Sequence, residues 1–313
     1  MLPCNEGPYV WDKKSQYTDR IYEGIGSIFQ HRTHSFIAKH FLKAKWIGSL
    51  INGHQPQEGD QSTYFGLSTS DCDQNSLKIH ENKQSLNFVY VPNTNKTRIH
   101  HVIKTTTVTN KTVFVYDWER VDEAHNFVKF DESFRNHFHE KRMLRQTPKR
   151  ELDEYWVSIH FRWGDVETSD PNKPDQRAGL SFTDYCRCIR YILYLKPHVK
   201  IFLFAENFTR VDMCKELEKP NVHLFNDSNS WKRDLDITSQ SQLLIGGSSS
   251  FFVLGAHLCG YGSTVCTVIH SSGMKFAESA YEKRIPKHLN TIPCQTSYRC
   301  YRKSIQELLQ MDH

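Results

Sequence analysis

Short apolar runs alternate with amphipathic stretches along the second half of the chain. Runs rich in β-branched and aromatic residues predict strands at residues 157–161, 199–204, 222–225, 242–245 and 264–269. Between them, helical spacing and capping residues predict helices at about residues 181–196, 209–217, 234–241 and 251–259. This alternation predicts an α/β fold with a parallel sheet covered by helices on both faces. Right-handed crossovers would place the strand-to-helix loops at one edge of the sheet, where such folds bind ligands.

The first half of the chain has a less regular pattern. Its apolar segments are short, and residues 52–86 are polar and loop-like. Apolar alternation in residues 86–91 and 113–118 predicts two strands. The pattern changes near residue 150, and a length of 313 residues fits two compact domains or one large one. We therefore expect a domain boundary near residue 150.

The composition is that of a polar globular protein. The hydrophobic share is 38%, the charged share is 24%, and the formal net charge of +5 is modest for this length. Basic residues are densest at residues 141–150, and acidic residues follow at once. We interpret this run as a solvated linker and expect no nucleic-acid partner. The small positive excess suits an anionic small ligand.

Signals for the cellular compartment point in two directions. No apolar run reaches the roughly 18–20 residues of a membrane span, and the first residues lack the pattern of a signal peptide. We therefore expect either a cytoplasmic protein, or a lumenal protein of the Golgi or endoplasmic reticulum whose chain has lost an upstream anchor. Four N-x-Ser/Thr sequons favour a secretory lumen. They begin at Asn95, Asn110, Asn207 and Asn226.

The nine cysteines cannot all pair within the chain, because their number is odd. Four of them lie in or beside apolar or helical segments and are expected to be buried thiols: Cys186, Cys188, Cys259 and Cys266. Cys294 and Cys300, in the tail segment CQTSYRC, have a loop spacing that suits a bridge.

Polar side chains follow the first predicted strand of the second half. The segment HFRWGD places His160 and Arg162 two residues apart, so both face the same side of an extended strand. The planar guanidinium of Arg162 can hold two phosphate oxygens, and Asp165 could orient it. An ion pair between Arg162 and Asp165 that only braces the loop is an equally good interpretation.

Two further strand ends carry Glu206 and a serine loop. Ser248, Ser249 and Ser250 follow a glycine turn and open the predicted helix that contains Phe251. Their hydroxyls and the free N–H groups of a helix N-terminus suit a pyrophosphate. Serine-rich loops are often only linkers, but this one is expected at the same sheet edge as Arg162. We therefore predict a nucleotide-diphosphate site at this edge.

A glycine turn near the N-terminus offers a further anion contact. The segment EGIG at residues 23–26 precedes Ser27 and an amphipathic stretch that runs to about residue 41. Backbone N–H groups at Gly24 and Gly26 could meet a phosphate. Glycine turns without ligands are common, so the turn by itself indicates no site.

Four segments together resemble the inverting fucosyltransferases, that is, the α-1,2- and α-1,6-fucosyltransferases and the protein O-fucosyltransferases. HFRWGD, residues 160–165, is similar to their HxRR(G/x)D motif, whose strand-end arginine grips the GDP-fucose diphosphate. EGIGSIFQ, residues 23–30, looks like their GLGNxxFQ segment. Residues 201–207 and 234–260 resemble their hhhFSDD strand and their third motif. All four segments occur in the family's order.

The resemblance implies a GT-B architecture, with two facing Rossmann-like domains that contain parallel sheets. Residues 1–150 would form the acceptor-side domain, residues 151–275 the GDP-sugar-binding domain, and residues 276–313 a tail packed back on the N-terminal domain. The implied reaction transfers fucose from GDP-β-L-fucose to an acceptor hydroxyl with inversion, without a metal or other cofactor. The implied partners are the nucleotide-sugar donor and a glycan or glycoprotein acceptor.

The combined pattern assigns roles to individual residues. Arg162 would stabilise the charge of the leaving group, and Glu23 or Asp165 would act as the general base; these three are the catalytic candidates. The residues expected to bind the donor are Gly24, Gly26, Ser27, His160, Arg162, Glu206, Asp236, Ser248, Ser249, Ser250 and Phe251.

Other interpretations stay open. Trp163 and Ser27 replace an arginine and an asparagine of the family motifs. This leaves room for a GT-B enzyme that uses another nucleotide sugar, or for a nucleotide- or glycan-binding module with a decayed site. A metal-dependent site is disfavoured, because the formal DxD motif at residues 234–236 falls in a predicted helix. A zinc protein is disfavoured because the HFHE segment at residues 137–140 and the CRC segment at residues 186–188 lack a paired second half.

Overall fold

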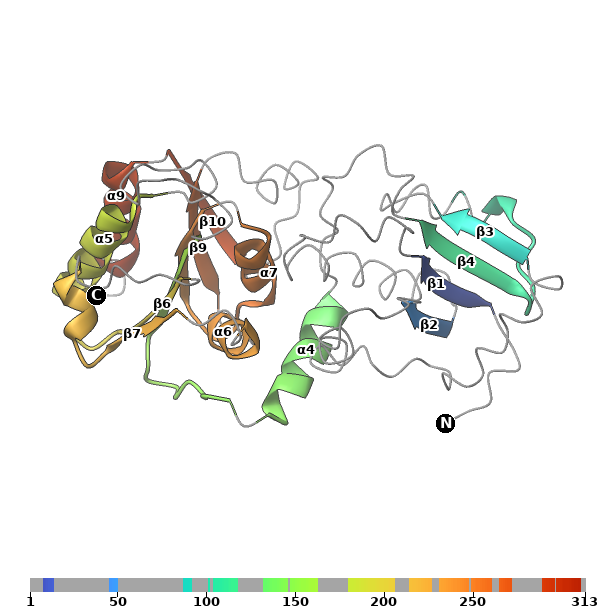
Figure 1. Ribbon diagram of the computed structural model, residues 1–313, viewed down its shortest axis with the longest axis horizontal. Helices are drawn as coiled ribbons and strands as arrows, with labels where there is room; N and C mark the ends of the chain where they lie inside the picture. Colours follow the sequence, from blue (N-terminus) through green and yellow to red (C-terminus); the bar gives the residue numbers. More distant parts are fainter. Residues whose placement is uncertain are drawn as a thin grey trace. The chain divides into compact units, whose positions relative to one another are not determined.

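The chain consists of two compact units, residues 1–141 and 142–313 (Figure 1). The computed structural model describes residues 8–13, 45–49, 87–91, 101, 104–117, 132–145, 147–162, 180–205, 214–226, 231–247, 249–260, 265–271, 289–295 and 297–310. The expected change of character near residue 150 lies close to the division between the two units.

The first unit contains a four-stranded parallel sheet in the order β2-β1-β4-β3. Its strands are β1 (Tyr9–Lys13), β2 (Lys45–Ser49), β3 (Asn87–Val91) and β4 (Thr112–Asp117). The two strands expected from apolar alternation, β3 and β4, are confirmed. Helix α4 (Glu132–Met143) follows and runs across the division into the second unit.

The second unit contains a six-stranded, entirely parallel sheet in the order β10-β9-β8-β5-β6-β7. Its strands are β5 (Trp156–Phe161), β6 (Lys200–Ala205), β7 (Val222–Phe225), β8 (Leu243–Gly246), β9 (Cys266–Ser271) and β10 (Leu289–Cys294). Numbered from its own first strand and read from the β7 edge, this order is 3-2-1-4-5-6. That is the strand order of a doubly wound dinucleotide-binding sheet, so the expected α/β class with parallel sheets is confirmed.

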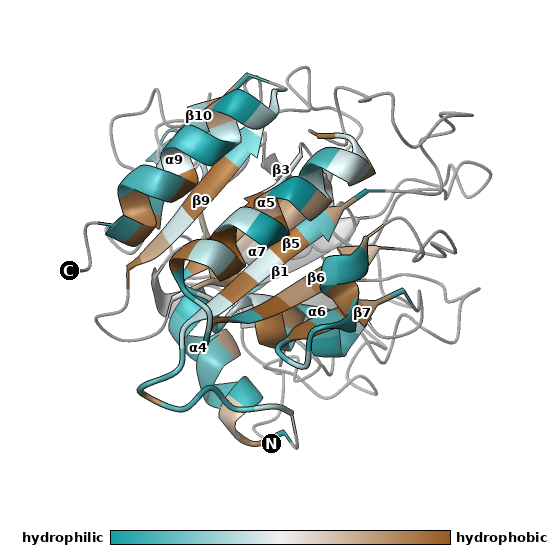
Figure 2. Ribbon diagram, turned by 90° about the vertical axis from the view of Figure 1, so that its left-hand side faces the viewer, coloured by the Kyte–Doolittle hydropathy of each residue, from teal (hydrophilic) through white to brown (hydrophobic). Residues whose placement is uncertain are grey.

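Helices cover both faces of this sheet (Figure 1). One face carries α5 (Phe182–Leu195) and α9 (Tyr298–Gln310), which lie side by side with hydrophilic residues outward (Figure 2). The other face carries α6 (Trp231–Thr238) and α7 (Ser250–Leu258). A 3₁₀ turn at Lys215–Glu218 precedes β7.

The alternation of side chains along β5 explains how the two faces are filled. Val157, Ile159 and Phe161 belong to the main hydrophobic core with residues of α5 and α9. Trp156 points to the opposite face and packs with Phe202, Phe204 and Ile237. Because strand side chains alternate, His160 lies on this second face, the one that α6 and α7 cover.

Local signals explain why α5 begins where it does. Ser181 is the N-cap residue, and its hydroxyl accepts a hydrogen bond from the Asp184 backbone N–H at 3.2 Å. Apolar residues at helical spacing, including Ile189 and Ile192, are fully buried against the sheet. The helix predicted from this capping pattern is therefore confirmed.

The tail contains a strand, β10, that the sequence analysis does not predict. The strand expected at residues 264–269 is not the last one, because β10 pairs with β9 along its whole length. The expected packing of the tail on the N-terminal domain stays a prediction, while its described residues belong to the second unit. They do so because β10 extends the second sheet and α9 buries Tyr301, Ile305 and Leu309 in that unit's core.

The cysteines also depart from expectation. Cys186 forms a disulfide with Cys214, and Cys259 forms one with Cys266, with Cα atoms 5.7 and 6.0 Å apart. Among the cysteines of the described segments, Cys188, Cys294 and Cys300 are free thiols. The expected bridge in the tail is therefore absent. The reason lies in the fold, which brings the segment before β7 against α5, a proximity that spacing along the sequence does not show.

Candidate functional site

The candidate site lies at the carboxyl end of the second sheet, between β5 and β8. These two strands are direct neighbours, with His160 opposite Gly246, while β6 continues on one side and β9 on the other. The order of strands reverses at this point, so the connections after β5 and β8 run to opposite faces of the sheet. Ligands of open α/β sheets bind in the crevice that such a switch point creates.

His160 forms part of this edge and stacks on the first turn of α7. Its ring centroid lies 5.6 Å from that of Phe251, with an angle of 30° between the planes. Phe252 lies 6.2 Å away at 31°. The predicted site residues His160 and Phe251, which are about ninety positions apart in the sequence, are therefore brought together.

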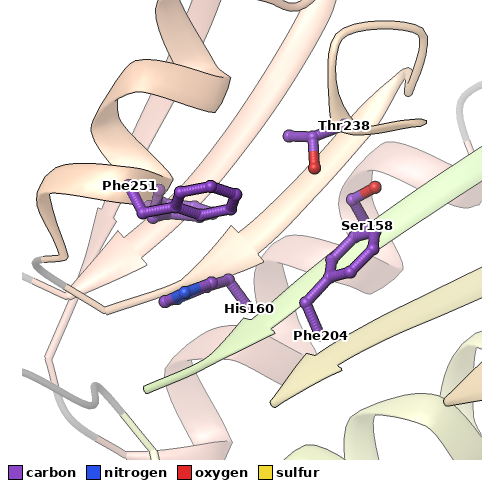
Figure 3. A pocket seen from close by; sticks show the side chains of 6 residues that line it. Ser158, His160, Phe204, Thr238 and Phe251 are labelled. Carbon is purple, nitrogen blue, oxygen red and sulfur yellow. The ribbon is translucent and has the colours of Figure 1, made fainter. Parts of the chain in front are cut away.

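A small pocket opens beside this ring stack (Figure 3). It is lined by Ser158, His160, Phe204, Thr238, Phe251 and Phe252. The lining comes from β5, β6, α6 and α7, and most of it consists of aromatic rings. Flat apolar walls of this kind suit a planar or apolar group of a ligand better than a phosphate.

Gly246 allows α7 to pack closely on the end of β8. A Cβ at this position would lie 2.8 Å from the Cδ2 and Cε2 atoms of Phe252. The carbonyl oxygen of Gly246 accepts a hydrogen bond from the Tyr301 hydroxyl at 3.1 Å. The strand end is thus held from both sides of the sheet, by a ring from α7 and by a hydroxyl from α9.

Helix α7 begins at this edge, and the first backbone N–H groups of a helix have no partner within the helix. Ser249 is the N-cap residue, with φ −92° and ψ 138°, and its carbonyl accepts from the Val253 N–H at 2.9 Å. Its hydroxyl makes no capping hydrogen bond. A helix N-terminus carries partial positive charge and favours an anion. No acidic residue lies in the first turn to compete for that position.

Arg162 follows directly after β5 and is half-buried. It lies two positions beyond His160 in the chain, at the carboxyl edge of the sheet. The connection that starts α7 leaves the neighbouring strand at the same edge. A cation and a helix N-terminus therefore emerge from adjacent strands, which is an arrangement that suits a diphosphate.

Asp236 has a different environment from the other predicted donor contacts. Its side chain is fully buried, and its Oδ1 accepts a hydrogen bond from Arg145 Nη1 at 2.6 Å. This ion pair ties the segment after α4 to α6. The contact accounts for the burial of the carboxylate, and a role in donor binding stays a prediction.

Several predicted site residues lie outside the described part of the chain. These are Glu23, Gly24, Gly26, Ser27, Asp165, Glu206 and Ser248. Ser250 is described as the first residue of α7, but nothing is described of its side chain. The assignments to all of these residues stay predictions.

Clustered metal ligands and membrane-spanning helices are both absent from the described segments of the chain. Within these segments, no group of three or more His, Cys, Asp or Glu side chains is placed to hold a metal ion. Among the helices that they form, none combines the length and apolar character needed to cross a membrane.

Four residues that line the pocket were not identified from the sequence: Ser158, Phe204, Thr238 and Phe252. Phe252 could have been identified from the sequence, since it follows Phe251 directly in a segment already assigned to the site. No sequence pattern indicates Ser158 or Thr238, because their place in the pocket depends on how β5 and α6 pack.

Comparison with known proteins finds solved structures that are distantly similar to this chain, and no match of any other kind. No protein-family model matches the chain, and no curated protein matches it. A glycosyl transferase family 9 structure from Veillonella parvula is 9% identical, with a TM-score of 0.44, and the match covers 100% of this chain and 99% of that one. TarM is 16% identical with a TM-score of 0.35, and the match covers 78% of this chain and 41% of TarM.

A GDP complex of an Arabidopsis thaliana FUT1 mutant is also similar. The identity is 12%, the TM-score is 0.35, and the match covers 80% of this chain and 68% of that one. At this level of similarity the fold assignment rests on the strand order of the sheets and not on these structures.

Proposed function

We propose that this chain is a glycosyltransferase that moves fucose from GDP-fucose to an acceptor hydroxyl with inversion. The observation that carries the proposal is the switch point of the second sheet, where Arg162 and the N-terminus of α7 emerge from neighbouring strands. The resemblance of four sequence segments to inverting fucosyltransferases supplies the choice of donor.

Binding of the donor follows from the charges at this edge. The fork of the Arg162 guanidinium would grip diphosphate oxygens, and the first N–H groups of α7 would donate to the others. The Ser249 hydroxyl, which makes no capping hydrogen bond, is available as a further donor. His160 and Phe251 would pack against a flat part of the ligand at the pocket.

Chemistry at this site depends on stabilising the leaving group. An acceptor oxygen attacks the anomeric carbon of fucose on the face opposite the diphosphate, the bond from that carbon to the β-phosphate oxygen breaks, and the configuration inverts. Negative charge grows on the β-phosphate as the bond breaks. Preorganised donors at that position are each worth about 10²–10³ in rate. The proton of the acceptor hydroxyl would pass to a base, for which Glu23 and Asp165 are the candidates.

The proposal is tested by incubating the protein with GDP-fucose and a mixed library of glycan, peptide and glycoprotein acceptors. Mass spectrometry should detect a product one deoxyhexose heavier than an acceptor, together with GDP. Transfer from another nucleotide sugar and none from GDP-fucose would favour a different donor. Binding of GDP without transfer or hydrolysis of any donor would favour a decayed site.

A further inference from the structure

We propose that Asn110 carries an N-linked glycan, so that the protein matures in an oxidising secretory lumen. This inference goes beyond the proposed transferase activity and does not depend on it. It rests on the turn that holds Asn110 and on the two disulfides of the second unit.

Asn110 is the first residue of the sequon Asn110-Lys111-Thr112. Of the four sequons in the sequence, it is the one whose three residues all lie in the described part of the chain. Asn110 and Lys111 are both exposed and form the corner of the turn that leads into β4. Within the described residues, the Asn110 amide makes no hydrogen bond or ring contact, so a glycan there would displace nothing.

The turn is closed by hydrogen bonds that leave the Asn110 side chain outside. The Thr112 N–H donates to the Thr109 carbonyl at 3.1 Å, and the Thr109 N–H donates to Thr112 Oγ1 at 2.8 Å. This geometry places Asn110 and Lys111 at the two central positions of a four-residue β-turn. Side chains at such an exposed corner point into solvent, and the glycan would leave the strand pairing of β4 intact.

The burial of Thr112 determines when Asn110 must be glycosylated. Thr112 is fully buried, and its hydroxyl is engaged within the turn. The hydroxyl at the third position of a sequon has to be accessible to the transferring enzyme, so the glycan must be added before β4 pairs with its neighbours. Transfer during entry of the chain into the lumen meets this requirement, and transfer to the folded protein does not.

The chemistry needs a co-reactant that only a secretory lumen supplies, namely an oligosaccharide linked to a lipid through pyrophosphate. The Asn110 amide nitrogen bonds to C1 of the first sugar, and the bond from C1 to the pyrophosphate oxygen breaks. The lipid pyrophosphate leaves, and the amide nitrogen loses one proton.

The disulfides are an independent observation that points to the same compartment. Cys186–Cys214 and Cys259–Cys266 link separate elements of the second unit. Disulfides of this structural kind persist in oxidising compartments and are rare in the reducing cytosol. The same lumen therefore supplies both the oxidised cysteines and the glycan donor.

The test starts with the full-length protein isolated from the cells that make it. One portion is digested without reduction to identify linked cysteine peptides. A second portion is treated with peptide N-glycosidase in heavy-oxygen water, which converts a glycosylated asparagine to an isotope-labelled aspartate. We expect label at position 110 and linked peptides for both cysteine pairs. A peptide with Asn110 wholly unmodified, or the four cysteines recovered as free thiols, would overturn the proposal.

Variants separate the role of Asn110 from that of the other sequons. The chain is expressed with an added signal sequence that directs it into the endoplasmic reticulum, and total protein is analysed by mass. Asn110→Gln and Thr112→Val should each remove one glycan, whereas Thr112→Ser and Asn87→Gln should remove none. Asn87 is a matched control because it is exposed, begins the adjacent strand β3 and lies outside any sequon. An unchanged glycan mass in Asn110→Gln would rule out this site.

Discussion

Arg162 is the residue on which the proposed chemistry depends most. It follows β5 at the switch point, half-buried, and its planar guanidinium can hold two phosphate oxygens. We expect Arg162→Ala to lower kcat/KM for fucose transfer by about 10²–10³-fold, because one preorganised donor to the leaving group is lost. The measurement is initial-rate kinetics on protein whose fold is checked by circular dichroism.

The matched control for this substitution is Arg299→Ala, an exposed arginine on α9. It should leave both transfer and the circular dichroism spectrum unchanged. Near-normal turnover in Arg162→Ala would remove Arg162 from the site.

His270 makes the folded state sensitive to acid. Its ring on β9 is fully buried, its Nδ1 lies 2.8 Å from the Ser271 carbonyl oxygen, and burial lowers its pKa below the ordinary value of 6.5. The unfolded chain therefore takes up this proton at a higher pH than the folded protein does. Stability should be complete above about pH 6.5 and should fall as the pH drops from there toward the lower folded-state pKa.

Denaturant unfolding between pH 5 and pH 8 measures this effect, in wild type and in His270→Gln. The variant should lose less stability than wild type as the pH falls, and His198→Gln, a change at an exposed turn, should behave like wild type. Equal pH dependence in all three proteins would mean that His270 is not the group responsible. His223, whose pKa burial also lowers, would then be examined next.

For single residues, the sequence predicted that His160 and Arg162 lie at the end of one strand, but not what His160 packs against. The two-residue spacing of His160 and Arg162 was enough to place both at the end of one strand. The stacking of His160 on Phe251 follows from the pairing of β5 with β8, which no local pattern encodes. The environment of Asp236 could not be predicted either, because its partner in the ion pair, Arg145, lies about ninety residues away in the sequence.

Among the elements, the contact between β8 and α7 is the tightest one at the site. Gly246→Ala would put a Cβ 2.8 Å from the Phe252 ring. Overpacking of this kind costs roughly 1–3 kcal/mol. For a protein of this size we expect the melting temperature to fall by about 2–4 °C for each kcal/mol lost. Binding of GDP should weaken as well, because the displaced ring belongs to the pocket wall.

A double variant separates this clash from a general effect of the glycine substitution. Phe252→Leu shortens the side chain that the new methyl group would meet. If the contact is the cause, the combined variant Gly246→Ala with Phe252→Leu should be more stable than the sum of the two single effects predicts. Strict additivity, measured by calorimetry, would show that the two residues do not interact.

Periodicity predicted the strands of the second sheet from β5 to β9, including the edge strand β7, but missed the other edge strand, β10. Strands β5, β6 and β8 are almost wholly buried and mostly apolar, which is the pattern expected for a parallel sheet covered on both faces. Strand β10, with the sequence LNTIPC, lies at the sheet edge, where its polar residues and Pro293 are tolerated. Its sequence is therefore that of a loop, and it becomes a strand only because β9 is there to pair with it.

For the whole molecule, the disulfide between α5 and the segment before β7 stabilises the second unit. The bridge Cys186–Cys214 closes a segment of 28 residues. Removing both cysteines, in Cys186→Ala with Cys214→Ala, should cost about 2–4 kcal/mol of unfolding free energy. Denaturant unfolding of the oxidised protein measures this cost.

The control for the disulfide variant is Cys300→Ala, a half-buried free thiol on α9. It should change the unfolding free energy much less than the double variant does. If the double variant is as stable as wild type, the bridge makes no contribution.

The order of strands could not have been predicted from the sequence. Alternating strands and helices predict a parallel sheet, but several strand orders are compatible with that alternation. The observed order places β5 and β8 in the middle of the sheet and thereby brings together two loops separated by more than eighty residues. The candidate site depends on this single feature of topology.

The most direct test of the account is isothermal titration of the whole protein with GDP and with UDP, repeated on Arg162→Ala. We expect GDP to bind more tightly than UDP, and Arg162→Ala to weaken GDP binding at least tenfold, which corresponds to about 1.4 kcal/mol. Tighter binding of UDP, or GDP binding that is unaffected by the loss of Arg162, would contradict it.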